Sequence, residues 1–412
     1  MLEHWPTLGI VGLTYAGIAA GRVPGLRMNR ATIAVVGVAL LLAARELPLG
    51  ALPGLVDADT LILLFSMMVL NANLRLAGFY ERAGALLLGA TDTPRALLAV
   101  VIAASGLLSA LLLNDTVCLM FTPLVLALTA RAGRPPAPYL IALATAANVG
   151  STATITGNPQ NMIIGVASGI PYLRFAAALA PVALLGLIVI WAVLVLLYPT
   201  EFAPGQRLAA AESPGGPLAP VDRPLLAKSL LVTLLLLVAF LAGVPVALAA
   251  LLAAAALFVS RRVDPEQVLG SCDWGLLLFF CGLFVISGAL ESNGLTARLF
   301  DALHLDGQCG IVRLTAVTAA LSNLVSNVPA VLLLKPVAAG LAGPEAGWLV
   351  LAMASTLAGN LTLLGSVANL IVAESARARG VSLGFWEYTR VGFLITLLTL
   401  LLGAAWLWLT LW

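Results

Sequence analysis

Charged side chains are scarce in this sequence: Asp, Glu, Lys and Arg make up 10% of its 412 residues, against about 25% in soluble domains. Hydrophobic residues make up 61%. No soluble core of this length needs so much apolar surface, so the surrounding solvent is expected to be lipid. Apolar stretches of about 20 residues recur, which is the length a helix needs to cross a ~30 Å hydrocarbon layer. The net charge of +2 carries no signal for nucleic acid.

Histidine and cysteine are also rare. His4 and His304 are the two imidazoles, and the four cysteines show no CxxC or metal-site spacing. We therefore expect free thiols, no structural metal and no cofactor. An intramembrane hydrolase would need a Ser–His pair or two aspartates at depth, and neither pattern is present, so an enzyme is not predicted. The first apolar stretch follows Glu3 and His4 rather than a basic region, which argues against a cleaved signal peptide.

Hydropathy and the breaks in it divide the chain into two series of segments. The first series consists of spans near 7–20, 31–48 and 58–75, a block at 95–130, a broken stretch at 138–168 and a span at 173–198. Residues 199–224 hold six prolines and three glycines and are interpreted as a linker. The second series repeats the order at 225–242, 244–260, 273–291, 311–342, 348–376 and 386–411.

The repetition extends to individual residues. The stretch from Asp59 to Phe65 parallels the stretch from Asp273 to Phe279, at an offset of 214. Asn114 and Pro123 parallel Asn327 and Pro336 at an offset of 213, and Thr154, Gly157 and Asn161 parallel Thr362, Gly365 and Asn369 at an offset of 208. Three such matches in order indicate a duplicated unit, with repeat 1 at 1–198 and repeat 2 at 225–412.

The blocks at 95–130 and 311–342 each contain a polar kink at mid-length, "LNDT" and "SNVP". Their arms are marginal in length for separate spans, so both are interpreted as re-entrant hairpins, hairpin 1 and hairpin 2. Each half then crosses the membrane five times, and an odd number inverts the second half. The predicted fold is an all-α polytopic membrane protein with two inverted repeats of five transmembrane spans, each with a re-entrant hairpin and a broken helix.

The distribution of arginine and lysine gives the orientation. With ten crossings, one face collects 16 of these residues and the other collects 4, with Lys335 left inside hairpin 2. The positive-inside rule places the rich face in the cytoplasm. Both termini are then outside an inner or plasma membrane, the linker at 199–224 is cytoplasmic, and the two hairpins enter from opposite sides. Seven crossings per half would give the same sides, so the charges do not test the hairpins themselves.

Four polar breaks interrupt the apolar blocks: 114–116, 148–161, 326–329 and 359–369. Irregular backbone at membrane depth is tolerated where it is buried in protein or lines an aqueous cavity. Half-helix N-termini attract negative charge, and unwound carbonyls can ligate cations. Asn114 and Asn327 are expected as helix N-caps, and Pro159 and Pro329 lie where a helix starts again.

The four breaks are predicted to meet near the midplane as one substrate or ion site. Its candidate residues are Asn114, Asp115, Thr116, Asn148, Gly150, Ser151, Thr152, Thr154, Gly157, Asn158, Asn161, Ser326, Asn327, Gly359, Asn360, Thr362, Gly365, Ser366 and Asn369.

Asp115 is the carboxylate among these breaks. A charge at membrane depth costs roughly 2.5–3.5 kcal/mol on insertion scales, so it calls for a partner or a role. Three roles are open: a proton carrier, a permanent cation ligand, or a charge at a helix N-terminus. Lys335 is expected to reach the exterior along its stem rather than to pair with Asp115.

At these residues the chain resembles the ion transporter superfamily of arsenite efflux pumps, sodium/proton antiporters and citrate or dicarboxylate transporters. The motifs are "NDTVCLMFTP", "ALATAANVGSTATITGNPQN", "SNVPAVLLL" and "STLAGNLTLLGSVANLIVAE". They are most similar to the silicon-efflux type of plants and its bacterial relatives. The resemblance implies an elevator-like homodimer, with scaffold parts at 1–78 and 225–292 and transport parts at 95–198 and 311–412.

The same resemblance assigns the hairpin tips and loops. Asn114, Asp115 and Thr116 match the family's first tip, Asn327 the second tip, and Gly157, Asn161, Gly365 and Asn369 the broken-helix loops. The dicarboxylate branch has Ser-Asn-Thr at both tips, whereas this chain has Asn-Asp-Thr and Ser-Asn-Val-Pro. An added acid and a lost hydroxyl argue against a sodium-rich site for a dianion.

The expected function is proton-coupled efflux of a small metalloid hydroxy acid such as silicic acid or arsenite. A sodium-coupled anion or dicarboxylate symporter and a sodium/proton antiporter remain alternatives. The expected coupling ion is H⁺, with Na⁺ as the other candidate. Expected partners are the small oxyacid, the lipid bilayer and a second copy of the chain, with no nucleic acid.

Overall fold

The computed structural model describes residues 5–21, 25–88, 91–208, 221–294, 310–341 and 343–411, and every element that these residues form is a helix. His4, His304, Cys309 and residues 209–220 of the expected linker lie outside the described part. Cys118, Cys272 and Cys281 are free thiols.

The first half of the chain forms ten α-helices and one short 3₁₀ helix in the described ranges. They are α1 (Trp5–Ala20), α2 (Arg30–Ala43), η1 (Leu49–Ala51), α3 (Leu52–Leu55), α4 (Ala58–Leu76), α5 (Phe79–Leu88), α6 (Pro94–Leu111), α7 (Asn114–Arg131), α8 (Ala137–Ser151), α9 (Pro159–Ser168) and α10 (Tyr172–Leu197). The second half contains α11 (Arg223–Leu241), α12 (Val246–Phe258), α13 (Pro265–Leu269), α14 (Trp274–Ser292), α16 (Gly310–Val325), α17 (Asn327–Ala339), α18 (Pro344–Ala358), α19 (Val367–Arg377) and α20 (Phe385–Leu411).

Two expected boundaries were wrong. The span expected at 31–48 ends at Ala43, because Arg45 adopts a left-handed φ of 60° and Pro48 precedes a new 3₁₀ turn. Helix α11 starts at Arg223, inside the expected linker, because Asp222 accepts a hydrogen bond from the Leu225 amide at 3.1 Å and caps it. The short helices α3, α5 and α13 were not expected from the sequence, since their apolar runs are too brief to stand out.

A helix break lies at or directly beside each of the four expected polar stretches, although 114–116 itself forms the first turn of α7. Helices α6 and α7 are separated by Leu112 and Leu113, and α16 and α17 by Ser326 alone. The other two breaks lie between α8 and α9 and between α18 and α19. Six helices of the described part are long and apolar enough to cross a membrane: α4, α6, α10, α11, α14 and α20.

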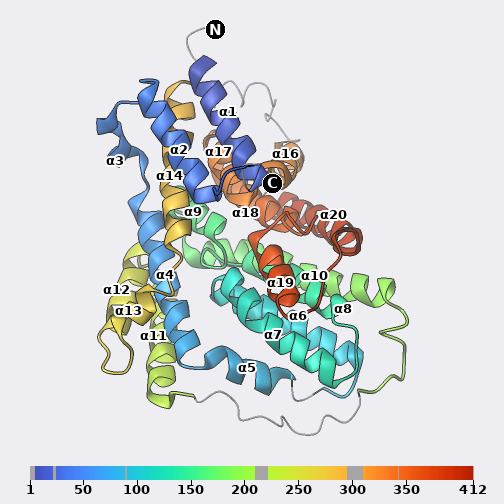
Figure 1. Cartoon of the computed structure of the whole chain (residues 1–412). Coiled ribbons are helices and arrows are strands. Elements are labelled where there is room, and N and C mark those ends of the chain that lie inside the picture. Colours follow the sequence, from blue (N-terminus) through green and yellow to red (C-terminus); the bar gives the residue numbers. More distant parts are fainter. Residues whose placement is uncertain are drawn as a thin grey trace.

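Helices from alternate quarters of the chain lie together (Figure 1). In the first group, α2 and α4 pack against α14 and α12, and in the second, α6–α8 and α10 pack with one another and with α18–α20. The groups meet where α4 contacts α9, α14 contacts α17 and α10 contacts α11. The site described below lies in the second group, with one side facing the first.

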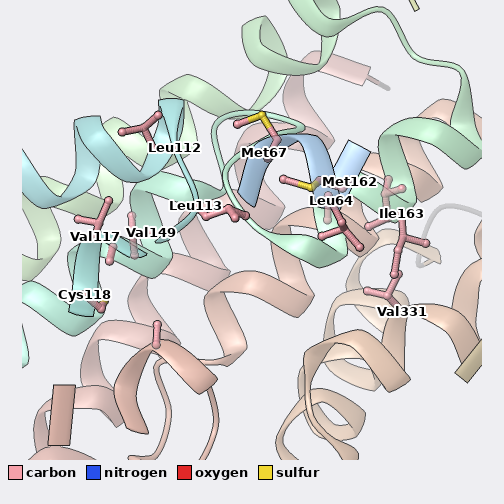
Figure 2. Packing of buried hydrophobic residues seen from close by; sticks show 14 of the residues in the cluster. Leu64, Met67, Leu112, Leu113, Val117, Cys118, Val149, Met162, Ile163 and Val331 are labelled. Atoms are coloured by element: carbon pink, nitrogen blue, oxygen red, sulfur yellow. The ribbon is translucent and has the colours of Figure 1, made fainter. Parts of the chain in front are cut away.

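Fully buried apolar side chains fill the junction between the two groups (Figure 2). Leu64 and Met67 of α4 lie beside Met162 and Ile163 of α9, and Val331 of α17 lies beside Ile163. Between helices in a membrane, such side chains stabilise the contact by van der Waals packing rather than by removal of apolar surface from water. Relative movement of the two groups therefore requires this layer to slide or separate.

Gly106 of α6 and Gly150 of α8 bring these two helices into backbone contact. A Cβ built at Gly150 would lie against the Gly106 backbone, and one at Gly106 would lie 2.7 Å from Leu187. Small residues let membrane helices approach this closely. Gly150 was expected in the irregular loop, but it lies inside α8.

Gly150→Ala is expected to destabilise the protein by about 3 kcal/mol, because the added methyl group overpacks a backbone contact that cannot shift cheaply. Thermal unfolding in detergent measures the effect. Gly12→Ala in α1 is the matched control, since a Cβ there meets nothing within 4 Å. Equal melting temperatures for the two variants would contradict the close packing of α6 on α8.

Candidate functional site

Asn148, near the end of α8, is the centre of a buried hydrogen-bond network. Its Oδ1 accepts from Asn114 Nδ2 at 3.2 Å and from Ser366 Oγ at 3.1 Å. Its Nδ2 donates to Asn360 Oδ1 at 2.9 Å and to Asn369 Oδ1 at 3.0 Å. This one amide therefore joins the tip between α6 and α7 to the break between α18 and α19, and it has no hydrogen-bonding capacity left.

The two broken-helix loops are held by the same pattern of hydrogen bonds. Asn161 Nδ2 donates to the carbonyls of Ser151 and Thr154, at 3.1 and 2.9 Å. Asn369 lies 208 residues later, and its Nδ2 donates to carbonyls that also lie 208 residues later. These belong to Gly359 and Thr362, at 2.8 and 3.1 Å.

Tight packing at two glycines completes both loops. A Cβ at Gly157 would lie against the Ser151 carbonyl, and one at Gly365 would lie 2.8 Å from the Gly359 carbonyl. Both loops therefore need glycine for close backbone approach. Asn158 caps α9 by accepting from the Asn161 amide at 2.9 Å, while Ser366 takes the N-cap position of α19.

The two halves also contact each other reciprocally. Asn148 bonds to Ser366 and Asn369. Thr356 lies 208 residues after Asn148 and is its counterpart in the second half. In the same way, the counterparts of Ser366 and Asn369 lie 208 residues before them, and the Thr356 hydroxyl bonds to both. These are Asn158, at 3.3 Å, and Asn161, at 3.5 Å. The two sets of contacts are therefore equivalent at an offset of 208 residues.

The tip between α6 and α7 is anchored at the break between α8 and α9. The Asn114 amide donates to the Gly157 carbonyl at 3.1 Å, and the Thr154 hydroxyl donates to the Ala110 carbonyl. The expected N-cap role of Asn114 is wrong, because Leu113 takes the cap position and Asn114 is the first helical residue. Its side-chain oxygen accepts from the Asp115 amide at 3.0 Å.

The second tip is built differently. Ser326, not Asn327, is the N-cap residue of α17, and its side chain makes no capping bond. Asn327 begins α17, and Pro329 lies in the first turn, where a missing N–H costs nothing. Asn323 Nδ2 donates to the Ala358 carbonyl at 3.0 Å and ties α16 to the end of α18.

Asp115 and Thr116 face away from the amide network, into a cavity of about 210 Å³. No hydrogen bond or ion pair of the Asp115 carboxylate is found among the described residues, although its place in the first turn of α7 lets the helix N-terminus favour its charge. The other residues that line the cavity are Met68, Asn71, Ala72, Arg75, Leu113, Leu119, Pro159, Ser271, Asp273, Leu276, Val367 and Ile371. The cavity therefore lies between α4 and the start of α14 on one side and α7 and α19 on the other.

Two charged residues at this cavity were not among the expected site residues. Arg75, at the end of α4, donates to Ser271 Oγ at 2.6 Å, and Asp273 caps α14 by accepting from the Leu276 amide. The parallel between Asp59 and Asp273 marked the latter as a repeat position, but nothing in the sequence placed it near Asp115. Thr356 is a further site residue that was not expected from the sequence. The repeat offset of 208 residues, applied to Asn148, would have identified it.

Most of the expected site residues are thus brought together, and a few are not. The amide network and its loops hold Asn114, Asn148, Ser151, Thr152, Thr154, Gly157, Asn158, Asn161, Gly359, Asn360, Thr362, Gly365, Ser366 and Asn369. Ser326 and Asn327 form a tip of their own, and Asp115 and Thr116 line the cavity. No group of three His, Cys, Asp or Glu that could hold a metal ion is found among the residues the structure describes.

Comparison with known proteins identifies the class of molecule. Residues 15–358 match the model of the citrate transporter family. This chain belongs to that family. A silicon efflux transporter of Oryza sativa subsp. japonica is 32% identical over 92% of the chain and 93% of its own length. An uncharacterised transporter of Mycobacterium tuberculosis is 31% identical over 96% of each.

A solved structure shares the fold of the transporter. The YdaH transporter of Alcanivorax borkumensis superposes with a TM-score of 0.59 at 16% identity, over 99% of this chain and 97% of that one. At this identity the likeness concerns the fold alone. The expectations of an integral membrane transporter and of a protein that is not an enzyme are confirmed.

Proposed function

We propose that the protein is a proton-coupled antiporter that exports a small, neutral metalloid hydroxy acid such as silicic acid or arsenite. One observation carries this proposal: the amide network of the breaks is uncharged, and beside it the Asp115 carboxylate, for which no hydrogen bond or ion pair is found among the described residues, lines a cavity of about 210 Å³ that Asp273 and Arg75 also line. Amide groups that are not saturated within the network, such as Asn327 Oδ1, can recognise a polyhydroxy acid by hydrogen bonds, and the carboxylate can carry the proton that moves the other way.

The similarity to a silicon efflux transporter over nearly the whole chain supports the direction and the substrate class. The alternative, sodium-coupled uptake of an anion, is favoured by the description of the family as citrate transporters. A dianion would need cationic partners, and Arg75 is the cation that lines the cavity. A sodium/proton antiporter is the third possibility, with Asp115 as its ion-binding carboxylate.

The inverted-repeat architecture belongs to the same proposal. The reciprocal contacts of Asn148 and Thr356 support a two-fold axis between the halves. The bond between Asn114 and Gly157 supports re-entry of hairpin 1, because its tip then lies at the mid-length break of a helix that crosses once. Relative movement of the two helix groups past each other, in a homodimer, would carry the site across the membrane.

Contacts between distant segments support the proposed sidedness. Arg75 bonds to Ser271, and Arg134 pairs with Glu201 at 3.7 Å, all on the face with more arginine and lysine. Thr7 donates to Glu46, and Arg174 pairs with Glu345 at 2.5 Å, all on the other face. Each contact joins residues that the ten-crossing topology places on the same side, with the termini outside and the linker in the cytoplasm.

The experiment that tests the function uses proteoliposomes with an imposed pH gradient and a pH dye inside. Silicic acid, arsenite, citrate and phosphate are added in turn, with and without sodium. Proton movement provoked by one neutral oxyacid without sodium is the expected result. Sodium-dependent accumulation of an anion without proton movement would contradict it and establish the symporter.

Ala72→Phe tests whether the cavity beside Asp115 is the substrate path. Ala72 lies on α4, is 4% exposed and lines the cavity without taking part in the amide network. A benzyl group there fills much of the space, so transport is expected to fall at least about tenfold, while overpacking costs only ~1–3 kcal/mol of stability. Ala72→Ser is the control and should transport normally. Full transport by the phenylalanine variant would place the path elsewhere.

A further inference from the structure

Positions 148 and 356, which correspond in the two halves, carry different side chains, and this difference makes the two hairpins unlike each other. Asn148 presents an amide, whereas its counterpart Thr356 presents a shorter hydroxyl. Asn148 uses its carbonyl oxygen to hold Asn114 at the tip of hairpin 1. The hydroxyl of Thr356 bonds within the α8–α9 break and not to Asn327, which is the counterpart of Asn114.

Hairpin 1 is therefore held at its tip by three bonds. These are the bond from Asn114 to Asn148, the bond from the Asn114 amide to Gly157, and the bond from Thr154 to the Ala110 carbonyl. In the described part of the chain, none of the three equivalent bonds is formed at hairpin 2. The side chain of Asn323, just before that tip, provides one bond to the Ala358 carbonyl instead.

Hairpin 2 also holds unused hydrogen-bond acceptors. Asn327 is 7% exposed, and its Oδ1 has no hydrogen-bond partner among the described residues. Its Nδ2 packs against Gly359, where an added Cβ would lie 2.9 Å from it. Asn323 Oδ1 is likewise without a partner, whereas the unpaired Ser322 hydroxyl does not distinguish the hairpins, because its counterpart Ser109 in hairpin 1 is also unpaired. Buried polar atoms are rarely left unpaired, and each exception points to strain, a ligand or water.

The backbone of this tip is strained as well. Ser326 has φ 80° and ψ 160°, a conformation that glycine adopts readily and other residues do not. The corresponding residue of hairpin 1, Leu113, has a relaxed φ of −62°. Strain, missing bonds and unpaired amide oxygens thus coincide at the tip of hairpin 2. Hairpin 1 has a relaxed backbone and all three bonds, and its unpaired groups in the described ranges are the Ser109 hydroxyl and the Asp115 carboxylate, neither of which is an amide.

We propose that hairpin 1 is a fixed platform and that the tip of hairpin 2 is the moving gate, which closes when Asn327 accepts a hydrogen bond from a hydroxyl group of the substrate. The asparagine-to-threonine difference between positions 148 and 356 makes this assignment. A neutral polyhydroxy acid supplies hydrogen-bond donors, as unpaired amide oxygens require, whereas the carboxylate groups of a dianion supply only acceptors. The identity of the ligand rests on the proposed function, but the difference between the two hairpins does not.

Hydrogen exchange of the full-length protein in nanodiscs tests the proposal. Without substrate, the four amides at 327–331 (Pro329 has none) are expected to exchange at least about tenfold faster than those at 114–118, since a single buried hydrogen bond is worth about that factor. Silicic acid or arsenite should slow exchange at 327–331 and leave 114–118 unchanged. Equal exchange at the two tips without substrate would overturn the gate.

Thr356→Asn supplies the missing amide at nearly constant volume. It is expected to slow exchange at 327–331 about tenfold without substrate and to reduce transport in proteoliposomes. Thr356→Ser keeps the hydroxyl and adds no amide, so exchange at 327–331 should stay as fast as in the unmodified protein, which separates latching from loss of packing. No slowing in the folded asparagine variant would overturn the role of position 356.

The ligand is tested separately from the gate. Protection of 327–331 by sodium and not by either oxyacid would overturn the assignment of Asn327 as a hydroxyl acceptor. Absence of any oxyacid flux in the unmodified protein would refute the proposed function. The difference in exchange between the two tips without substrate would still test whether hairpin 2 is the moving gate.

Discussion

Asp115→Asn is expected to abolish proton movement coupled to the oxyacid while leaving the protein folded. An amide has nearly the shape of the carboxylate but cannot exchange a proton in the physiological range. No hydrogen bond or ion pair of the carboxylate is lost, as far as the described residues show, and removing a charge at membrane depth costs no stability. The proteoliposome assay with an internal pH dye measures the effect, and the melting temperature should be unchanged or higher.

Asp59→Asn is the matched control. Asp59 lies in the first turn of α4, as Asp115 lies in the first turn of α7, but it lines a different cavity. Its variant should keep coupled transport. Full coupled transport by Asp115→Asn would exclude the proton-carrier role. Loss of sodium dependence rather than of proton movement would make Asp115 a cation ligand.

Asn148→Ala is expected to cost about 3–5 kcal/mol of unfolding free energy and to abolish transport. The substitution removes four hydrogen bonds and leaves their partners buried, and each such orphan costs roughly 1–3 kcal/mol. Thermal unfolding in detergent should show a melting temperature several degrees lower. Transport should fail because the hairpin 1 tip is no longer tied to the break in the second half.

Asn73→Ala provides the comparison for this second prediction. Asn73 is as buried as Asn148, at 1% exposed, but its amide bonds only to the Val69 carbonyl of its own helix, at 2.9 Å. About 1 kcal/mol or less should be lost there. Similar melting temperatures for the two variants would show that the Asn148 network adds nothing beyond local helix bonding.

The order of helices and breaks followed from the sequence because the signals are local. A run of apolar residues determines a span, and the polar groups of "GNPQN" and "AGNLTLLGSVAN" mark where it is interrupted. Helix ends were predicted less well. The end of α2 at Ala43 depends on the left-handed Arg45, and the start of α11 at Arg223 depends on the Asp222 cap, and hydropathy registers neither. The N-cap positions of Asn114 and Asn327 were wrong by one residue for the same reason.

The sequence by itself determined that the chain is a membrane protein of transporter type, with paired breaks at offsets of 213 and 208 residues. Tertiary structure decided what those breaks do. The bond from Asn148 to Asn360 spans 212 residues, and Arg75 reaches Ser271 across 196, so no local pattern encodes either. Only the packed arrangement shows that the first tip makes three bonds whose equivalents are missing among the described residues of the second, because unpaired acceptors are defined by what lies around them in space.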